Sequence, residues 1–431
     1  MDPFQYLADL EKFGIKFGLH NISVLCAALD HPERACRSVI IAGTNGKGSV
    51  AAMVDTAGRA AGLRTARYTS PHLVRLEERF VIDGRPVATE RLREALARIP
   101  PLVATWRERG ELQAEPTFFE VTTAVAFDLF RQAGVDLVVL EVGMGGRFDA
   151  TSIAPSMAAA ITTIDFDHEK YLGHTLAEIA FEKAGVIKAG MPVVVGETKP
   201  EPFAVIAAAC RERDAVLIDA RAGVTTSVSL VDGRTQLRLD TPARAYAPLR
   251  LALRGRHQVA NAVVAVRLLE ALERLGLPIT AEAIVAGLTD VAWRGRLDLV
   301  RTARGAVLLD GAHNRAGARA LADYLAEVYP AGLPMVFGAM GDKDAAGMLE
   351  VLLPHATQLV VTRPRNPRAQ RPDALAEVAR AVRPIPVTVE DDPARALRRA
   401  QDAGPVVLVA GSLFLVGDIL AELDTPDTPA R

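Results

Sequence analysis

The chain has 431 residues, of which 50% are hydrophobic, so it is long enough for two or three domains with well-buried cores. Its formal net charge is −2 and it contains no long basic run. This charge balance argues against general binding to nucleic acid or to an anionic membrane surface. No apolar stretch is long enough to span a bilayer, so we also expect no membrane-embedded segment.

The N-terminal sequence and the cysteines indicate the compartment. Residues 1–14 lack the basic and apolar segments of a signal peptide. Cys26, Cys36 and Cys210 are odd in number and widely spaced, which favours free thiols over a disulfide framework or a zinc site. We therefore expect a globular protein of the reducing cytoplasm.

Residues 39–52 read VIIAGTNGKGSVAA, a β-branched apolar run followed by a glycine loop and an alanine-rich segment. This order is typical of a phosphate-binding loop between a strand and a helix. The glycines remove side chains that would keep backbone N–H groups away from a polyphosphate. Lys47 adds a mobile cation, and Ser49 adds a hydroxyl at the positive end of a helix. The stretch predicts binding of a nucleoside triphosphate, with a purely structural turn as the alternative.

The loop departs from the usual G-x-x-x-x-G-K-[ST] pattern, because Gly48 stands between Lys47 and Ser49. This variant points to one branch of the nucleotide-binding proteins.

Apolar strands alternate with amphipathic helices from about residue 38 to 220, which predicts a mostly parallel sheet covered on both faces. The expected strands are 38–42, 137–142, 158–164, 192–195 and 215–218. The expected helices are 49–61, 117–132, 175–184 and 202–213. Two of these helices begin with a capping box, formed by Thr117 with Glu120 and by Thr175 with Glu178.

The pattern changes after residue 222. Segments 224–230 and 235–239 alternate around Asp232-Gly233, as in a β-hairpin, and helices are expected at 257–275 and 281–288. A second α/β alternation follows, with strands expected at 305–309, 334–337, 358–361, 386–389 and 405–409. We expect the polar end from Asp424 onward to fray.

These patterns predict an α/β fold in two parts. A phosphate-loop domain with a mostly parallel sheet and a small β-rich subdomain would cover residues 1–297. A Rossmann-like α/β domain would cover residues 298–431.

Polar residues that follow the expected strands are the first candidates for a site, because ligands bind at this edge of such sheets. Glu141 ends the run DLVVLE and is well placed to hold Mg²⁺, although an N-cap or a pair with Arg147 is the alternative. His168 follows the next expected strand. It could be a metal ligand or a general base, and the alternative is a surface or capping residue. For Lys183, the residues alone favour a solvated lysine at a helix C-terminus over a lysine that is turned toward a metal.

Less specific signals come from three other places. Ser70 lies in a loop whose hydroxyls can reach a metal or substrate, although Ser-Pro is ordinarily a turn. Asp310 and His313 again follow an expected strand, in the second domain. Arg294 and Arg296 lie at the domain junction, where they are either phosphate ligands or exposed linker residues.

Taken together, these segments resemble the folylpolyglutamate synthase/dihydrofolate synthase branch of the Mur-type ligases. The resembling segments cover nearly the whole chain in the family's order: GTNGKGS (43–49), TSPHL (69–73), TFFE (117–120), EVGMGGRFDAT (141–151), DHEKYLG (167–173), EKAGVIK (182–188), GRHQVANA (255–262), WRGR (293–296), DGAHN (310–314), NPRA (366–369) and GSLFLVG (411–417). Each alone is modest, whereas the ordered set is very specific. DATS (149–152) stands where DATN is common and WRGR where proline-glycine-arginine is frequent, differences that affect fine specificity more than the reaction.

The resemblance implies ATP and Mg²⁺ as ligands. The ATP phosphates would be bound by Asn45, Gly46, Lys47, Gly48 and Ser49, and other parts of the nucleotide by Asn261, Arg296 and Asp310. One Mg²⁺ would be held by Ser70, Glu141 and His168. Lys183 matches a family lysine that is carbamylated, and would be an acidic ligand of a second Mg²⁺. His313 would lie near the phosphoryl-transfer site, and the pterin-bearing substrate would contact Thr117, Phe118, Phe119, Glu120, Phe148, Asp149 and Ala150.

The implied reaction adds L-glutamate to dihydropteroate, to reduced folates, or to both, with ATP and an acyl-phosphate intermediate. Another Mur-type amino-acid ligase is one alternative, against which the GKGS loop and DGAHN argue. A phosphate-loop switch that binds or hydrolyses nucleotide without ligation is the other. We expect a monomer with small-molecule partners, without nucleic acid or membrane.

Overall fold

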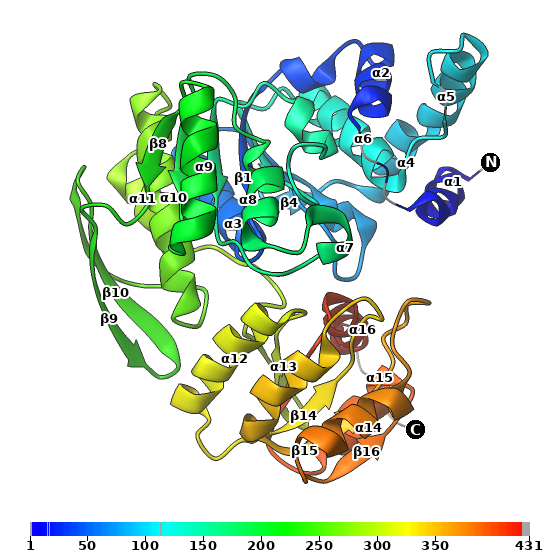
Figure 1. Cartoon of the computed structure of the whole chain (residues 1–431), viewed down its shortest axis with the longest axis vertical. Helices are drawn as coiled ribbons and strands as arrows, with labels where there is room; N and C mark the ends of the chain where they lie inside the picture. The colour runs from blue at the N-terminus through cyan, green and yellow to red at the C-terminus, as the bar shows by residue number, and fades with distance from the viewer. Residues whose placement is uncertain (1, 15, 17, 113, 425–431) are drawn as a thin grey trace.

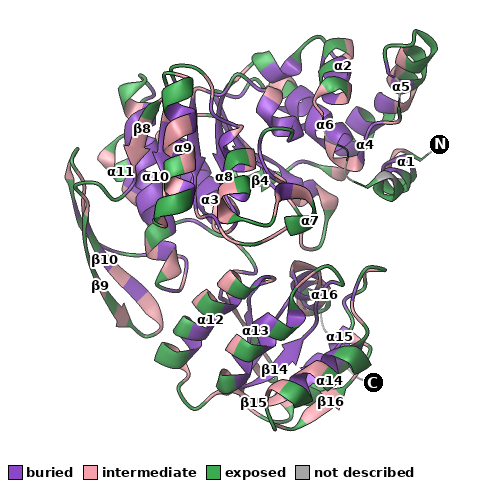
Figure 2. Ribbon diagram, in the orientation of Figure 1, coloured by how far each residue is buried: buried purple, intermediate pink, exposed green. Residues whose placement is uncertain are grey.

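The computed structural model describes residues 2–14, 16, 18–112 and 114–424. It contains two α/β units, one above the other in Figure 1, and a small antiparallel sheet that extends from the upper unit along the side of the lower one. Purple, buried segments run through the middle of both units, whereas the outer faces of the covering helices are exposed (Figure 2). The end that we expected to fray lies outside the described residues, apart from Asp424. Within the described ranges, no helix is both long and apolar enough to cross a membrane.

The first unit is built on an eight-stranded sheet. Across it the strands lie in the order β4 (Arg85–Pro86), β3 (Phe80–Ile82), β2 (Thr65–Tyr68), β5 (Leu137–Glu141), β1 (Arg37–Ala42), β6 (Ala158–Ile161), β7 (Pro192–Val195) and β8 (Val216–Asp219). The six strands from β2 to β8 in this order are parallel, and β3 and β4 extend the sheet in antiparallel fashion. The mostly parallel sheet is confirmed, with an antiparallel edge that the sequence patterns did not indicate.

The strand expected over 158–164 ends at Ile161, because the chain beyond it bonds to neighbouring loops instead of continuing the ladder. The hydroxyl of Thr162 donates to the carbonyl of Asn45 at 2.7 Å, and the carbonyl of Thr163 accepts from the N–H of Thr44 at 2.6 Å. The residues after β6 therefore hold the phosphate loop in place.

Two separate cores cover the two faces of this sheet. Val39 and Ile41 face the core formed with α3 (Lys47–Ala60), α10 (His257–Arg274) and α11 (Ala281–Thr289). Ile40 and Ala42 face the opposite core. Helices on that side are α1 (Pro3–Leu10), α2 (His20–Ala28), α4 (Thr89–Ala97), α5 (Ile99–Glu108), α6 (Phe118–Ala133), α8 (Leu176–Ala184) and α9 (Pro200–Glu212).

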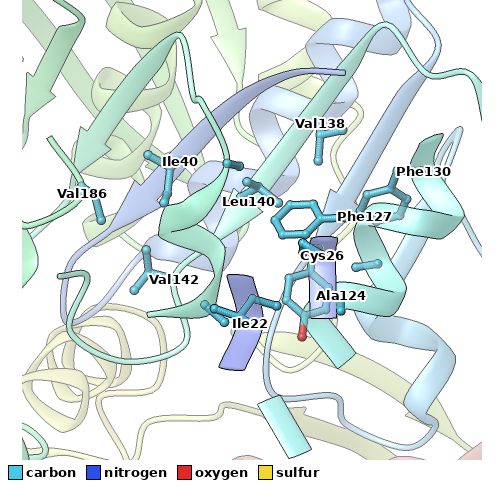
Figure 3. Close-up of a cluster of buried hydrophobic side chains, with 14 of the residues drawn as sticks. Ile22, Cys26, Ile40, Ala124, Phe127, Phe130, Val138, Leu140, Val142 and Val186 are labelled. Carbon is cyan, nitrogen blue, oxygen red and sulfur yellow. The ribbon is translucent and has the colours of Figure 1, made fainter. Parts of the chain in front are cut away.

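Figure 3 shows the second of these cores, where Phe127 of α6 lies near Leu140 and Val138 of β5 and near Cys26 of α2. Cys26 is buried, and all three cysteines are free, as expected. Both predicted capping boxes are present, at the starts of α6 and α8. Four helices on this side, α1, α2, α4 and α5, carried no sequence prediction. In α5 the reason is visible, because Pro100 and Pro101 occupy its first turn, where proline is tolerated although it reads as a helix breaker.

The small sheet has three strands in the order β11 (Ala245–Arg250), β10 (Arg234–Asp240) and β9 (Thr225–Val231). The predicted hairpin is confirmed: Asp232 and Gly233 have φ of 50° and 68°, as a type I′ turn requires. β11 was not predicted. The hairpin tip reaches the second unit, where the hydroxyl of Tyr324 donates to the carbonyl of Gly233 at 3.3 Å.

The second unit has a six-stranded sheet covered by helices. The strand order is β12 (Asp298–Thr302), β13 (Gly305–Leu309), β17 (Val406–Ala410), β14 (Leu333–Phe337), β15 (Ala356–Val361) and β16 (Val387–Val389). Only β12 runs antiparallel to its neighbour. The helices are α12 (Arg315–Val328), α13 (Ala345–Leu352), α14 (Pro372–Val382), α15 (Pro393–Gln401) and α16 (Leu413–Asp424). All five predicted strands are present, with ends that differ by one or two residues at most.

Candidate active site

The phosphate loop connects β1 to α3 at the carboxyl edge of the first sheet. Gly46 precedes α3 with φ of 89°, a conformation that favours glycine. The ammonium group of Lys47 donates to the carbonyls of Gly43 and Thr44, each at 3.1 Å. The first turn of α3 has backbone N–H groups without helical partners. This geometry is that of an anion site with a lysine folded back over its loop.

Asn261 of α10 lies directly against this loop. A Cβ on Gly46 would lie 2.2 Å from Oδ1 of Asn261, so the asparagine packs on the glycine backbone. Its side-chain amide donates to Oε1 of Gln258 at 2.9 Å, which fixes its orientation. The structure therefore brings Asn261 together with the loop, from a helix more than 200 residues further along the chain.

Glu141 ends β5, next to β1 in the sheet, and is only 6% exposed. Burial raises the pKa of this carboxyl group. Its hydrogen-bond partner is the N–H of Ser70 at 3.2 Å, and it forms no ion pair with any residue that the structure describes. The alternative pair with Arg147 is wrong, because that guanidinium binds Glu182 at 2.5 Å. A buried carboxylate with one backbone donor is suited to a cation supplied from outside the chain.

His168 follows β6, on the other side of the phosphate loop. It is the residue before α7 (Glu169–Leu172), and its backbone is in the left-handed conformation, with φ of 54°. Burial lowers the pKa of His168 to about 4, and nearby Lys343, Lys47 and Lys183 act in the same direction. The imidazole is therefore neutral at pH 7 and keeps a lone pair for a metal or proton.

Lys183 is not the solvated lysine that the residues alone favoured. It is 4% exposed, and its ammonium group donates to the carbonyl of Gly43 at 2.9 Å. Burial lowers the pKa of Lys183 to about 7, and the charge of Lys47 acts in the same direction. Helix α8 turns this side chain inward because Ile179, Ala180, Lys183 and Ala184 share its buried face.

Residues of the second unit close over the loop. The side chains of Asn45 and Asn314 exchange hydrogen bonds of 3.1 and 3.3 Å. Asp167 forms a salt bridge with Lys343, accepts from Asn314 at 3.2 Å, and has Nε2 of His313 at 3.6 Å. Burial acts to raise the pKa of Asp167, but the nearby His313, His168 and Lys343 outweigh it and lower the pKa. His313 is thus placed at the interface between the units, beside the loop.

Arg296 and Asp310 occupy different positions at this interface. Arg296 lines a cavity of about 180 Å³ together with Ser70, Glu141 and Gly48. The carboxylate of Asp310 instead accepts from the backbone N–H groups of Leu297 and Ala312, both at 2.9 Å. Arg294 also lines this cavity, and its guanidinium group pairs with Asp424 at 2.6 Å.

The two segments assigned to a pterin-bearing substrate meet at Gly143. A Cβ on Gly143 would lie 2.7 Å from the ring of Phe119, and the N–H of Gly143 donates to Asp149 at 2.9 Å. The carboxylate of Glu120 accepts from the N–H and the hydroxyl of Thr117. Arg79 lies over the ring of Phe118, and Arg147 over that of Phe148, which is 36% exposed. Ala150 is buried beside Asp149. Thr117, Glu120 and Asp149 thus have internal partners, and Phe148 is partly exposed beneath the guanidinium group of Arg147.

Sequence reasoning missed Asp167, Asn314 and Lys343 as site residues. Asp167 and Asn314 lie beside His168 and His313 in the same strand-end segments. Lys343 follows β14 in the stretch GAMGDKD, a charged turn after a buried strand, which is the signal that could have found it. In the described ranges, no three His, Cys, Asp or Glu side chains cluster as a metal site.

Comparisons with known proteins agree with this geometry. Residues 84–269 match the Mur ligase middle domain, and residues 295–413 match the Mur ligase glutamate ligase domain. The Bacillus subtilis dihydrofolate synthase/folylpolyglutamate synthase is 33% identical over 96% of both chains. Mycobacterium tuberculosis folylpolyglutamate synthase, solved with ADP and AMPPCP, has a TM-score of 0.90 and 36% identity, covering 98% of this chain and 99% of that one. The bifunctional Yersinia pestis enzyme, solved with AMPPNP and a Mn ion, has a TM-score of 0.84 and 32% identity, covering 98% of each. The chain therefore belongs to the dihydrofolate synthase/folylpolyglutamate synthase family of ATP-dependent glutamate ligases, within the Mur ligase superfamily.

Proposed function

We propose that this enzyme adds L-glutamate to dihydropteroate, to reduced folates, or to both, through an acyl phosphate formed with ATP. The observation that carries the proposal is the phosphate loop with the buried Lys183 against it, Glu141 at the end of the next strand, and Asn314 of the second unit closing over it. Two units that close over a cleft would exclude water from an acyl phosphate, which water otherwise hydrolyses.

In this proposal the nucleotide lies along the interface. Asn45, Gly46, Lys47, Gly48 and Ser49 bind its phosphates, and Asn261, Arg296 and Asp310 bind its other parts. The position of Arg296 and Asn261 beside the loop supports this assignment. We further propose that the two domains divide at 297/298, that the enzyme is a monomer and that it works in the cytoplasm.

A divalent cation fits the residues present, because Glu141 is a buried carboxylate without an ion pair among the described residues. Ser70, Glu141 and His168 would hold it, and it would neutralise charge on the phosphates. The neutral imidazole of His168 is in the state that can donate a lone pair.

Lys183 would complete a second cation site once carbamylated. With its pKa lowered to about 7, a substantial fraction of the amine is unprotonated near neutral pH. The lone pair of that amine would attack CO₂, so that a nitrogen–carbon bond forms, one carbon–oxygen π bond breaks with its electrons moving to oxygen, and the nitrogen releases a proton, which leaves a carbamate with one negative charge. A carbamate supplies the oxygen ligands that Mg²⁺ prefers, which an ammonium group does not.

The chemistry proceeds in two displacements. An oxygen of the substrate carboxylate attacks the γ-phosphorus, the bond to the bridging oxygen of the β-phosphate breaks, and ADP leaves. The amine of glutamate then attacks the acyl carbon, inorganic phosphate leaves, and the nitrogen loses a proton. The chain contributes positive charge from Lys47 on the loop, and His313 at the interface would lie near the transferred phosphoryl group. Thr117, Phe118, Phe119, Glu120, Phe148, Asp149 and Ala150 would position the pterin-bearing substrate.

One assay tests the proposal: ADP release with dihydropteroate or tetrahydrofolate, each with and without L-glutamate. We expect ADP release only when both an acceptor and glutamate are present. ADP release at the same rate with and without glutamate would indicate a nucleotide switch. Dependence on a different amino acid or acceptor would indicate another Mur-type ligase.

A further inference from the structure

Gly48, the second residue of α3, is a glycine for a reason that its backbone does not explain. Gly43 and Gly46 have φ of 137° and 89°, whereas Gly48 lies within the helix and has no positive φ. An alanine would therefore fit the backbone at this position. A Cβ would nevertheless lie 2.6 Å from Cζ2 of Trp293 and 3.2 Å from its Nε1. The edge of the Trp293 indole occupies the space that a side chain at Gly48 would need.

Trp293 is held in this position from its other side. The guanidinium carbon of Arg67 lies 4.9 Å from the centre of the indole ring, which is a cation–π distance. Arg67 donates to the carboxylate of Asp55 at 3.0 Å, and Asp55 is fully buried in α3. The hydroxyl of Thr65 donates to the same carboxylate at 2.6 Å. The indole is thus enclosed between Gly48 and an arginine that is anchored to the same helix.

Trp293 belongs to the linker between α11 and β12, three residues before Arg296. Trp293, Arg296 and Gly48 line the same cavity of about 180 Å³, together with Glu141. Any shift of the linker therefore moves Trp293 against the phosphate loop and moves Arg296 relative to the loop at the same time.

We propose that Trp293 is a positioning residue, which sets the place of the phosphate loop relative to Arg296 and transmits nucleotide binding between them. The inference rests on the proposed nucleotide site. Contact with the indole restrains the first turn of α3, whose N–H groups face the anion. Without the indole, the loop and the linker would move independently, and nucleotide affinity would fall. We expect Trp293→Ala to raise KM for ATP and Kd for ADP about tenfold, with kcat changed by less than about threefold.

A double-mutant cycle tests the contact itself. We expect Gly48→Ala to weaken ADP binding by about tenfold or more, because its Cβ meets the indole. In a Trp293→Ala background, the same alanine should have almost no further effect. Trp293→Phe, which keeps an aromatic ring under Arg67, should retain most of the affinity and serves as the fold-preserving control. An equal loss from Gly48→Ala in both backgrounds would overturn the inference, since the glycine would then be required by the ligand and not by Trp293.

A spectroscopic signal tests the coupling. The chain has two tryptophans, and Trp106 lies on α5, so Trp106→Phe leaves Trp293 as the single indole reporter. Titration with ADP and Mg²⁺ should change its emission with a midpoint equal to the Kd from calorimetry, and Arg67→Met should alter that emission in the free enzyme. If calorimetry shows that ADP binds while Trp293 emission stays unchanged, the inference about Trp293 is overturned and the proposed function is not. Absence of ADP binding to the unmodified enzyme would overturn the proposed function together with it.

Discussion

Glu141 and Asp310 both lie at the carboxyl end of a buried strand, one in each sheet, yet their carboxylates are used differently. Each acid ends or follows a buried strand, and they are 6% and 7% exposed. Asp310 accepts two backbone N–H groups at 2.9 Å, which satisfy it within the chain. Glu141 accepts one, at 3.2 Å, and has no ion pair among the described residues. The same pattern thus produces a carboxylate held by two backbone donors in one unit and a carboxylate open to an outside cation in the other.

The largest effect should come from removing the positive charge of the phosphate loop, in the unit that contains Glu141. Lys47→Ala takes away the one loop ammonium group, so the developing charge on the phosphates loses its stabilisation. We expect glutamate-dependent ADP release to fall by about 10³-fold or below detection, with an unchanged far-UV circular dichroism spectrum. ADP release that persists with dihydropteroate and glutamate would contradict the assignment of this lysine.

Glu141→Gln tests whether Glu141, the first member of the comparison, holds a cation. The amide keeps the shape but cannot neutralise a cation, so we expect activity to fall by about 10²-fold and the Mg²⁺ concentration for half-maximal rate to rise. The thermal midpoint should stay the same or rise, because the substitution removes a buried charge whose pKa burial has raised. Scanning calorimetry checks this, and a marked loss of stability with normal Mg²⁺ dependence would assign Glu141 a structural role.

Carbamylation of Lys183, in the same unit as Glu141, predicts that activity depends on dissolved CO₂. We expect removal of CO₂ from buffers to lower activity several-fold and bicarbonate to restore it, whereas Lys183→Met should be inactive under both conditions. A bicarbonate-independent wild-type rate would contradict carbamylation.

The lowered pKa of Lys183 also predicts a pH effect on stability. Between the native pKa of about 7 and the ordinary value of 10.5, the unfolded chain binds more protons than the native one. The free energy of unfolding should therefore rise with pH across this window, while the penalty of the buried charge is fully present below pH 7. Urea unfolding of wild type and Lys183→Met in CO₂-free buffer at pH 7 and 9 measures the difference, which should shrink at the higher pH.

A clear loss of stability, with a smaller effect on turnover than the substitutions above, should come from Asp310, the second member of the comparison. Asp310→Ala leaves the N–H groups of Leu297 and Ala312 without their acceptor, which should lower the free energy of unfolding by about 1–3 kcal/mol. Denaturant titration against Asp310→Asn, which retains an acceptor oxygen, provides the matched control. Equal stability of the alanine variant and wild type would remove the contrast with Glu141.

The fold was predicted best where one pattern dominates locally. β13 matches its predicted range, and α6 and α8 begin at their capping boxes, because these features depend on neighbouring residues. The strand after Ala158 was predicted too long, since the chain at Thr162 bonds to the phosphate loop instead. β2 to β4, β11 and β12 were missed, because short strands of two to six residues acquire their pairing from partners elsewhere in the chain.

The site divides in the same way. The phosphate loop, the acids after the strands and the order of the family's segments were all predictable, because each is a local run of residues. Three features became visible only in the folded chain: Lys183 is buried against Gly43, Asp167 joins the two units, and Trp293 fills the space beside Gly48. The physical reason is that burial, pKa and steric exclusion depend on atoms brought together from distant parts of the chain, and no local pattern specifies those neighbours.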